Sequence, residues 1–195
     1  MRLDAGICTV RSWRTSDLGS LVNHANNRNI WINLRDSFPY PYTRADGERW
    51  IKYAKRQIPE TNFAISVGGR AAGAVGFHPQ PDVHRRSAEI GYWVGEPFWG
   101  RGIATAALRA ITNYAFENHD LCRIYATVFE WNTASMRVLE KCGYVREAVL
   151  QQSIVKDGRV IDSVLYAIVR KEVAGRESQV ASQDSDFPQP EARGS

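Results

Sequence analysis

The sequence has few of the features that mark disulfide-rich or membrane-spanning proteins. It contains 3 cysteines in 195 residues, and an odd number of thiols cannot pair completely. Its longest apolar stretches, such as 164–169, fall far below the ~18 residues that a membrane span requires. The opening residues 1–6 contain no apolar run of the kind that secretion signals carry. We therefore expect no disulfides, no membrane contact and a cytoplasmic location.

Net charge is also small, and it is unevenly distributed. The chain has 25 Lys and Arg residues against 21 Asp and Glu residues, a net charge of +4. Segment 174–195 carries −2, which leaves +6 on residues 1–173. This surplus is compatible with a phosphorylated cofactor or a ribosome-associated partner, and we expect no direct contact with nucleic acid. With 44% hydrophobic residues, the sequence predicts one globular domain over 1–173 and a polar, disordered tail over 174–195.

Hydrophobic periodicity predicts an α+β fold, with a mixed, mostly antiparallel twisted sheet flanked by helices. A Gly-Gly turn and an Asp-Gly turn predict two hairpins. An aromatic, proline-punctuated stretch over 31–42 is expected to be a loop. The predicted strands are 7–11, 63–67, 72–77, 88–94, 124–129, 145–155 and 160–169, and the predicted helices begin at Thr15-Ser16-Asp17, Thr43, Ile103 and Asn132.

The strongest chemical signal is the stretch Gly95 to Thr105, which connects a predicted strand to a predicted helix. Two glycines permit a tight turn, and a helix N-terminus leaves several N–H groups unpaired with a partial positive charge. The pattern indicates a phosphate site, with an ordinary strand-to-helix turn as the alternative. A P-loop is excluded because no Gly-Lys follows. A dinucleotide fold would need a third glycine, although Glu130 after strand 124–129 superficially matches its acidic residue.

Three segments together resemble the Gcn5-related N-acetyltransferases (GNAT), in particular the RimJ/RimL-like branch that acetylates ribosomal-protein N-termini. They are Ala-Glu-Ile-Gly-Tyr-Trp-Val-Gly at 88–95, Phe-Trp-Gly-Arg-Gly-Ile-Ala-Thr at 98–105, and the segment 132–144, in family order and spacing. The resemblance runs over most of 7–171. It implies the GNAT acyl-CoA N-acyltransferase fold, with a splayed V between strands 88–94 and 124–129 that holds acetyl-CoA as co-substrate.

The resemblance also assigns cofactor contacts. The family signature Gln/Arg-x-x-Gly-x-Gly/Ala overlays 99–104, with Trp99 in place of Gln or Arg. Backbone amides of this turn would wrap the pyrophosphate, Arg101 would add a cation, and an N–H near Val94 would serve as oxyanion donor. The residues so assigned are Tyr92, Trp93, Val94, Trp99, Gly100, Arg101, Gly102, Ile103, Ala104, Thr105 and Asn132.

Acetyl transfer requires a neutral amine, and Glu89 is the candidate general base. It is a carboxylate within an otherwise apolar strand, where a raised pKa would suit a base that acts through water. The alternative is a structural carboxylate paired with Arg85, Arg86 or Arg123. Members of the ribosomal branch often carry a Glu near position 154, where this chain has Ile154.

The departing thiolate benefits from a proton, and Ser135 is the candidate donor or cofactor contact. It lies three residues after the predicted cap Asn132, on the helix face shared with Leu139 and Cys142. The alternative is a capping or solvated serine, which is common in a first turn. Many related enzymes carry a Tyr donor at the position of Leu139. Cys142 lies at a helix C-terminus, which raises a thiol pKa, so we interpret it as a core residue.

The acceptor is expected to contact Trp31, Asn33, Arg35 and Asp36, since the family places its acceptor wall in this region. The four histidines share no ligand spacing, so no metal is predicted. The predicted reaction is direct acetyl transfer to a primary amine, with a protein N-terminal α-amine as first choice. The alternatives are a small amine (amino acid, polyamine or drug) or a non-catalytic CoA-binding module. The chain is expected to be a monomer or homodimer.

Overall fold

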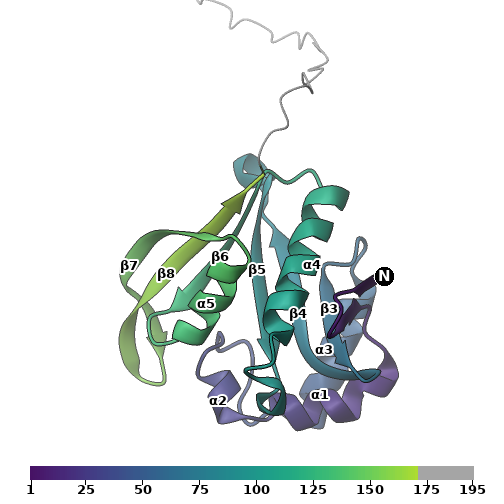
Figure 1. The fold of residues 1–195 in the computed structure, drawn as a ribbon. Coiled ribbons are helices and arrows are strands. Elements are labelled where there is room, and N and C mark those ends of the chain that lie inside the picture. Colours follow the sequence, from purple (N-terminus) through teal and green to yellow (C-terminus); the bar gives the residue numbers. More distant parts are fainter. Residues whose placement is uncertain (171–195) are drawn as a thin grey trace, which may run out of the picture.

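Eight strands form one sheet in the order β1-β2-β3-β4-β5-β6-β8-β7 in the computed structural model, which describes residues 1–170 (Figure 1). All neighbouring strands pair antiparallel except β5 and β6. The strands are β1 Arg2–Asp4, β2 Thr9–Arg11, β3 Asn62–Val67, β4 Arg70–Pro79, β5 Ser87–Val94, β6 Arg123–Phe129, β7 Val145–Lys156 and β8 Arg159–Val169. The helices are α1 Leu18–Ala25, α2 Arg28–Trp31, α3 Arg44–Arg56, α4 Ile103–Asn118 and α5 Thr133–Lys141, with 3-10 turns at Thr15–Asp17, Asp82–His84 and Glu96–Phe98.

Local sequence signals explain where several elements begin and end. Thr43 and Asp46 form a reciprocal capping box at the start of α3. The side chain of Asn132 accepts from the backbone N–H of Ser135 and caps α5. Gly143, with φ of +87°, follows the last turn of α5, in a conformation that glycine adopts without a Cβ penalty. These predicted boundaries are confirmed.

Helices cover both faces of the sheet. Successive strand residues point to opposite faces. Phe63 and Val75 join the cluster that contains the buried side of α4, whereas Ala64 and Ala74 join the cluster formed with α1 and α3. Helix α4 therefore packs over the centre of the sheet and α5 beside it, while α1 and α3 cover the other face (Figure 1).

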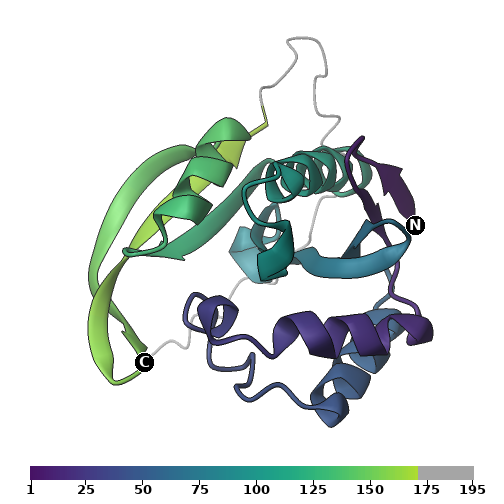
Figure 2. The same ribbon diagram turned by 60° about the horizontal axis from the view of Figure 1, so that its bottom comes forward.

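The sheet splits between β5 and β6. These strands pair in parallel only at Ser87, Ala88 and Glu89, opposite 123–125. Beyond Glu89, no strand of the described residues 1–170 pairs with this edge of β5, while β6 continues with β8 and turns away with the β7–β8 hairpin (Figure 2). The predicted mixed sheet with a splayed V is confirmed.

Some predicted boundaries were wrong. The first predicted strand, 7–11, is confined to β2, and β1 precedes it. The predicted loop 31–42 is entered through the short helix α2. Elements of three or four residues are too short to show a periodicity. The predicted tail 174–195 and residues 171–173 lie outside the described part of the chain. None of the helices within 1–170 has the length and apolar character needed to cross a membrane.

Candidate active site

A cavity of about 1360 Å³ occupies the split in the sheet. Its wall combines the end of β5, the turn and first residues of α4, one side of α5, the loop after α2 and the end of β7. Sites for a single small ligand measure ~300–1,000 Å³. The cavity therefore has room for two reactants, and it is lined from both faces of the sheet.

The glycine-rich turn presents a row of backbone donors to this cavity. Within residues 1–170, none of the backbone N–H groups of 100–105 donates a hydrogen bond to the protein. Gly100 and Gly102 have φ of +71° and +76°, which places the chain in the left-handed region where glycine is favoured. Gly102 is the N-cap of α4, so the donors coincide with the positive end of a 16-residue helix. This arrangement can hold a phosphate group.

Trp99 fastens this turn to the sheet. Its indole Nε1–H donates to the Val94 carbonyl oxygen at 2.6 Å. The side chain that departs from the family signature thus has a positioning contact that the sequence did not indicate. Arg101 does not line the cavity, and its guanidinium carbon lies 5.8 Å from the Phe98 ring centroid. The contact of Arg101 with a phosphate stays a prediction.

Beyond Glu89, β5 offers a free edge to the cavity. Along a strand of an antiparallel pair, the backbone N–H and C=O groups of one residue point toward the partner strand and those of the next residue point away from it. The Gly95 N–H donates to the Ala72 carbonyl, so the register turns the backbone polar groups of Tyr92 and Val94 toward the split. Trp99 occupies the Val94 carbonyl, whereas the Val94 N–H and both backbone groups of Tyr92 have no hydrogen-bond partner among residues 1–170 and are available to a ligand.

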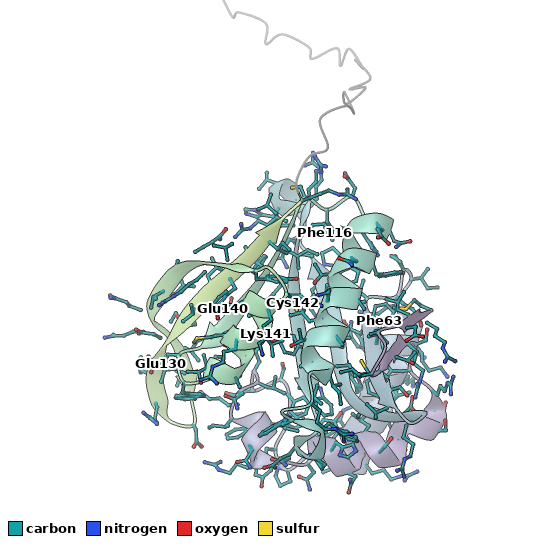
Figure 3. All side chains as sticks on the ribbon, in the orientation of Figure 1. Phe63, Phe116, Glu130, Glu140, Lys141 and Cys142 are labelled. Atoms are coloured by element: carbon teal, nitrogen blue, oxygen red, sulfur yellow. The ribbon has the colours of Figure 1, made fainter. Side chains whose placement is uncertain are left out.

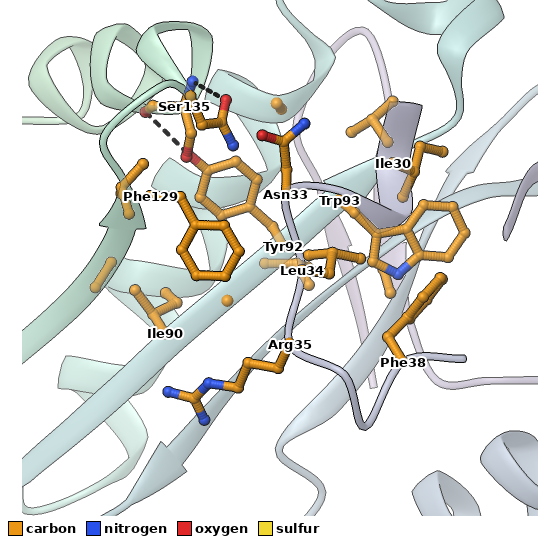
Figure 4. A pocket seen from close by; sticks show the side chains of 18 of the residues that line it. Ile30, Asn33, Leu34, Arg35, Phe38, Ile90, Tyr92, Trp93, Phe129 and Ser135 are labelled. Atoms are coloured by element: carbon orange, nitrogen blue, oxygen red, sulfur yellow. Dashed lines mark hydrogen bonds between the residues drawn. The ribbon is translucent and has the colours of Figure 1, made fainter. Parts of the chain in front are cut away.

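Tyr92 and Ser135 bring two hydroxyl groups together on the α5 side of the cavity (Figure 4). The Tyr92 hydroxyl lies 2.9 Å from Ser135 Oγ and 3.1 Å from the Ser135 carbonyl oxygen, to which it donates. Burial raises the pKa of Tyr92 above its ordinary value, so the phenol stays protonated near neutrality. The alternative that Ser135 is a capping or solvated serine does not hold: Asn132 is the cap and accepts from the Ser135 backbone N–H, and the Ser135 hydroxyl is paired with Tyr92. Tyr92 was predicted only as a cofactor contact, and its pairing with Ser135 was not predicted because the two lie 43 residues apart in the sequence.

Glu89 and Trp93 point to the face opposite Tyr92, where the loop after α2 lies. The Glu89 carboxylate accepts from the Arg35 guanidinium, and its side chain is 18% exposed. Pairing with Arg85, Arg86 or Arg123 is not observed: Arg86 pairs with Asp120 and Arg123 with Glu147. The alternative partners named from the sequence were therefore wrong, and the partner is Arg35, 54 residues away.

The loop after α2 reaches the cavity and is tied to the tip of the β7–β8 hairpin. Asn33, Arg35 and Asp36 line the cavity, as Figure 4 shows for the first two. The Lys156 ammonium lies 2.7 Å from Asp36 Oδ1 and 3.7 Å from the Trp31 ring centroid. Trp31 itself does not line the cavity. Its ring lies against the Lys156 ammonium, whereas the other three predicted acceptor residues, Asn33, Arg35 and Asp36, line the cavity.

Helix α5 contributes two further cations, Arg137 and Lys141, that line the cavity and were not singled out from the sequence. Their i, i+4 spacing on one helix face was the available signal.

Lys141 and Cys142 lie at the end of α5, beside α4 (Figure 3). Burial raises the pKa of the Cys142 thiol, whose sulfur lies 3.4 Å from the Thr105 carbonyl oxygen. A protonated, hydrogen-bonded thiol fits a packing role.

Comparison with known proteins gives a consistent result. The family model of the acetyltransferase (GNAT) domain matches residues 8–145. The uncharacterized N-acetyltransferase YoaA of Bacillus subtilis is 40% identical over 139 residues, which cover 71% of this chain and 72% of that protein. YdaF of the same species, named as a candidate ribosomal N-acetyltransferase, is 34% identical, covering 62% of this chain and 67% of YdaF.

A solved structure extends the match to most of the chain. Mycobacterium smegmatis RimJ in complex with CoA-disulfide superposes with a TM-score of 0.76 at 27% identity, covering 89% of this chain and 87% of RimJ. The matched family model, the relatives and the split sheet all indicate the same family. This chain belongs to the GNAT family of N-acetyltransferases.

Proposed function

We propose that this enzyme transfers the acetyl group of acetyl-CoA to the α-amine at the N-terminus of a protein. The single observation that carries the cofactor assignment is the set of N–H groups at 100–105, which have no partner within residues 1–170 and belong to a turn that borders the cavity. Such a row at a helix N-terminus matches a diphosphate in charge and in hydrogen-bonding capacity. The complex of RimJ with CoA-disulfide supports the same ligand class.

The acceptor assignment rests on the branch of the family. The chain resembles RimJ and is 34% identical to a relative named as a candidate ribosomal N-acetyltransferase. The net charge of +4 is compatible with a ribosome-associated partner.

Each part of the cavity then has a task. Bound acetyl-CoA would supply a thioester whose carbonyl carbon accepts the amine. The free edge of β5 would pair with the pantetheine amides, and the Val94 N–H would stabilise the oxyanion that develops. The Tyr92–Ser135 hydroxyl pair would give a proton to the departing thiolate. The amine would enter from the face of Asn33 and Asp36, and its proton would pass to a base at or beside Glu89.

Mass spectrometry of a peptide library incubated with acetyl-CoA tests the acceptor. We expect acetylation at the α-amine, with kcat/KM for the best peptides at least ~10-fold above that for amino acids, spermidine or aminoglycosides in a parallel thiol-release assay. Transfer only to small amines would show the acceptor assignment to be wrong. Tight binding of acetyl-CoA without thiol release for any amine would identify a non-catalytic module.

The proton donor is tested with Tyr92→Phe and Ser135→Ala. We expect each change to lower kcat toward the low end of the ~10²–10⁴-fold range for general acid catalysis, since a thiolate is a good leaving group. Ser16→Ala is the matched control, because Ser16 is exposed and lies outside the cavity. Unchanged kcat in both cavity variants would remove the hydroxyl pair from the mechanism.

A further inference from the structure

Three titratable side chains form a row across the sheet at the apex of the split. His78 on β4 and Tyr125 on β6 are the register partners of Glu89 on β5. Register partners on neighbouring strands point to the same face, with Cβ atoms ~4.5–5.5 Å apart in an antiparallel pair. The row stands where the free edge of β5 begins. A thioester carried along that edge from the glycine-rich turn would end beside it.

His78 is the one imidazole among the described residues that line the cavity. Within residues 1–170, neither of its ring nitrogens has a hydrogen-bond partner. Glu89, by contrast, is already engaged, because its carboxylate accepts from Arg35. The second oxygen of Glu89 keeps free lone pairs, so both groups can accept a proton, but Glu89 is fixed by its ion pair with Arg35 whereas no hydrogen bond within residues 1–170 holds the His78 ring.

Burial of the His78 ring favours its neutral form. Its partial burial at the cavity rim lowers its pKa below the ordinary 6.5, while Glu89 raises the pKa and Arg35 lowers it. Across the cavity, Asp46 and Arg49 on α3 are paired with each other. Burial raises the pKa of Tyr125, so its phenol is uncharged near neutrality.

We propose that His78 is the general base of acetyl transfer and that Glu89, held by Arg35, is a positioning residue. This inference rests on the proposed function. As the bond between the amine nitrogen and the acetyl carbon forms and the C–S bond breaks, the proton released by nitrogen passes to the His78 ring. The thiolate takes its proton from the Tyr92–Ser135 pair. The His78 ring is only partly buried, so it returns its proton to water, and solvent reprotonates the hydroxyl pair.

The dependence of kcat on pH at saturating acceptor peptide separates the two candidate bases. The wild-type enzyme is expected to lose activity as the pH falls through the pKa of one group below about 6.5. This loss of activity is the acidic limb of the pH profile. His78→Gln should lower kcat at pH 7 by ~10²–10⁴-fold and abolish the acidic limb. Glu89→Gln should keep the limb and move it to lower pH, because the carboxylate charge raises the pKa of His78. His84→Gln is the matched control, since His84 is exposed and outside the cavity.

Chemical rescue is a measurement that a purely structural role of His78 would not affect. Imidazole added to His78→Ala should restore kcat at least ~10-fold, while acetyl-CoA affinity in both His78 variants stays at the wild-type value. A His78→Gln enzyme that keeps the rate and the limb, with a Glu89→Gln enzyme that loses both, would overturn the proposal in favour of Glu89. A wild-type protein that binds acetyl-CoA but acetylates no amine would instead refute the proposed function itself.

Discussion

Gly102→Ala tests whether the backbone of the turn holds the cofactor. Gly102 has φ of +76°, and an L-residue there costs roughly 1–2 kcal/mol. An added Cβ would meet Ile7 Cδ1 at 3.5 Å, an ordinary contact, so the strain arises from the backbone alone. Relief of that strain rotates the amides of 100–105 away from their common target. A hydrogen bond to a charged group contributes about 1.5–3 kcal/mol, so losing one weakens acetyl-CoA binding about 10- to 100-fold.

Gly68→Ala is the matched control for this prediction. Gly68 has φ of +56°, has open space around its Cβ position and lies in the β3–β4 turn, outside the cavity. Urea unfolding should show comparable destabilisation in both variants, and isothermal titration calorimetry should show weakened acetyl-CoA binding in Gly102→Ala alone. Equal affinity in the two variants would refute the assignment of the turn.

Two further predictions contrast a fully buried ion pair with a half-buried one. Arg11 and Asp17, with side chains 4% exposed, pair at 2.7 Å, so Asp17→Asn should cost about 3–5 kcal/mol in urea unfolding by leaving a buried charge. Burial opposes ionisation of Asp17, but hydrogen bonds from Arg11 and the Arg14 backbone outweigh it and lower the pKa. The stabilisation is therefore present above about pH 4 and is lost as the pH falls through the lower folded-state pKa, a dependence that should be absent from Asp17→Asn. Lys156→Met should change stability by less than about 1 kcal/mol, because the Asp36 left behind is 72% exposed, yet raise KM for the acceptor severalfold in steady-state kinetics by releasing the loop after α2. An unchanged KM would argue against that loop as the acceptor wall.

Long, regular elements and the glycine-rich turn could be predicted from the sequence because their signals are local. Helix α4 shows a clear apolar face, and the β7–β8 hairpin is marked by Asp157-Gly158. Helix α3 is marked by its capping box. The family resemblance supplied the arrangement of these elements around a split sheet.

The contacts that complete the candidate site could not be predicted, because they join distant parts of the chain. Arg35 meets Glu89 across 54 residues, and Lys156 meets Asp36 across 120. No spacing rule connects such positions, and single-sequence patterns report only neighbours within one element. The His78 register with Glu89 depends on how β4 and β5 pair, which local periodicity leaves undetermined.

The central claim is that the amides of 100–105 hold the diphosphate of acetyl-CoA. Titration of ¹⁵N-labelled protein with CoA, followed by amide NMR spectra, tests it most directly. We expect the amides of 100–105 to show the largest shifts, because N–H groups without a partner within residues 1–170 acquire charged acceptors. Saturable binding that leaves these six amides unshifted while others move would contradict it.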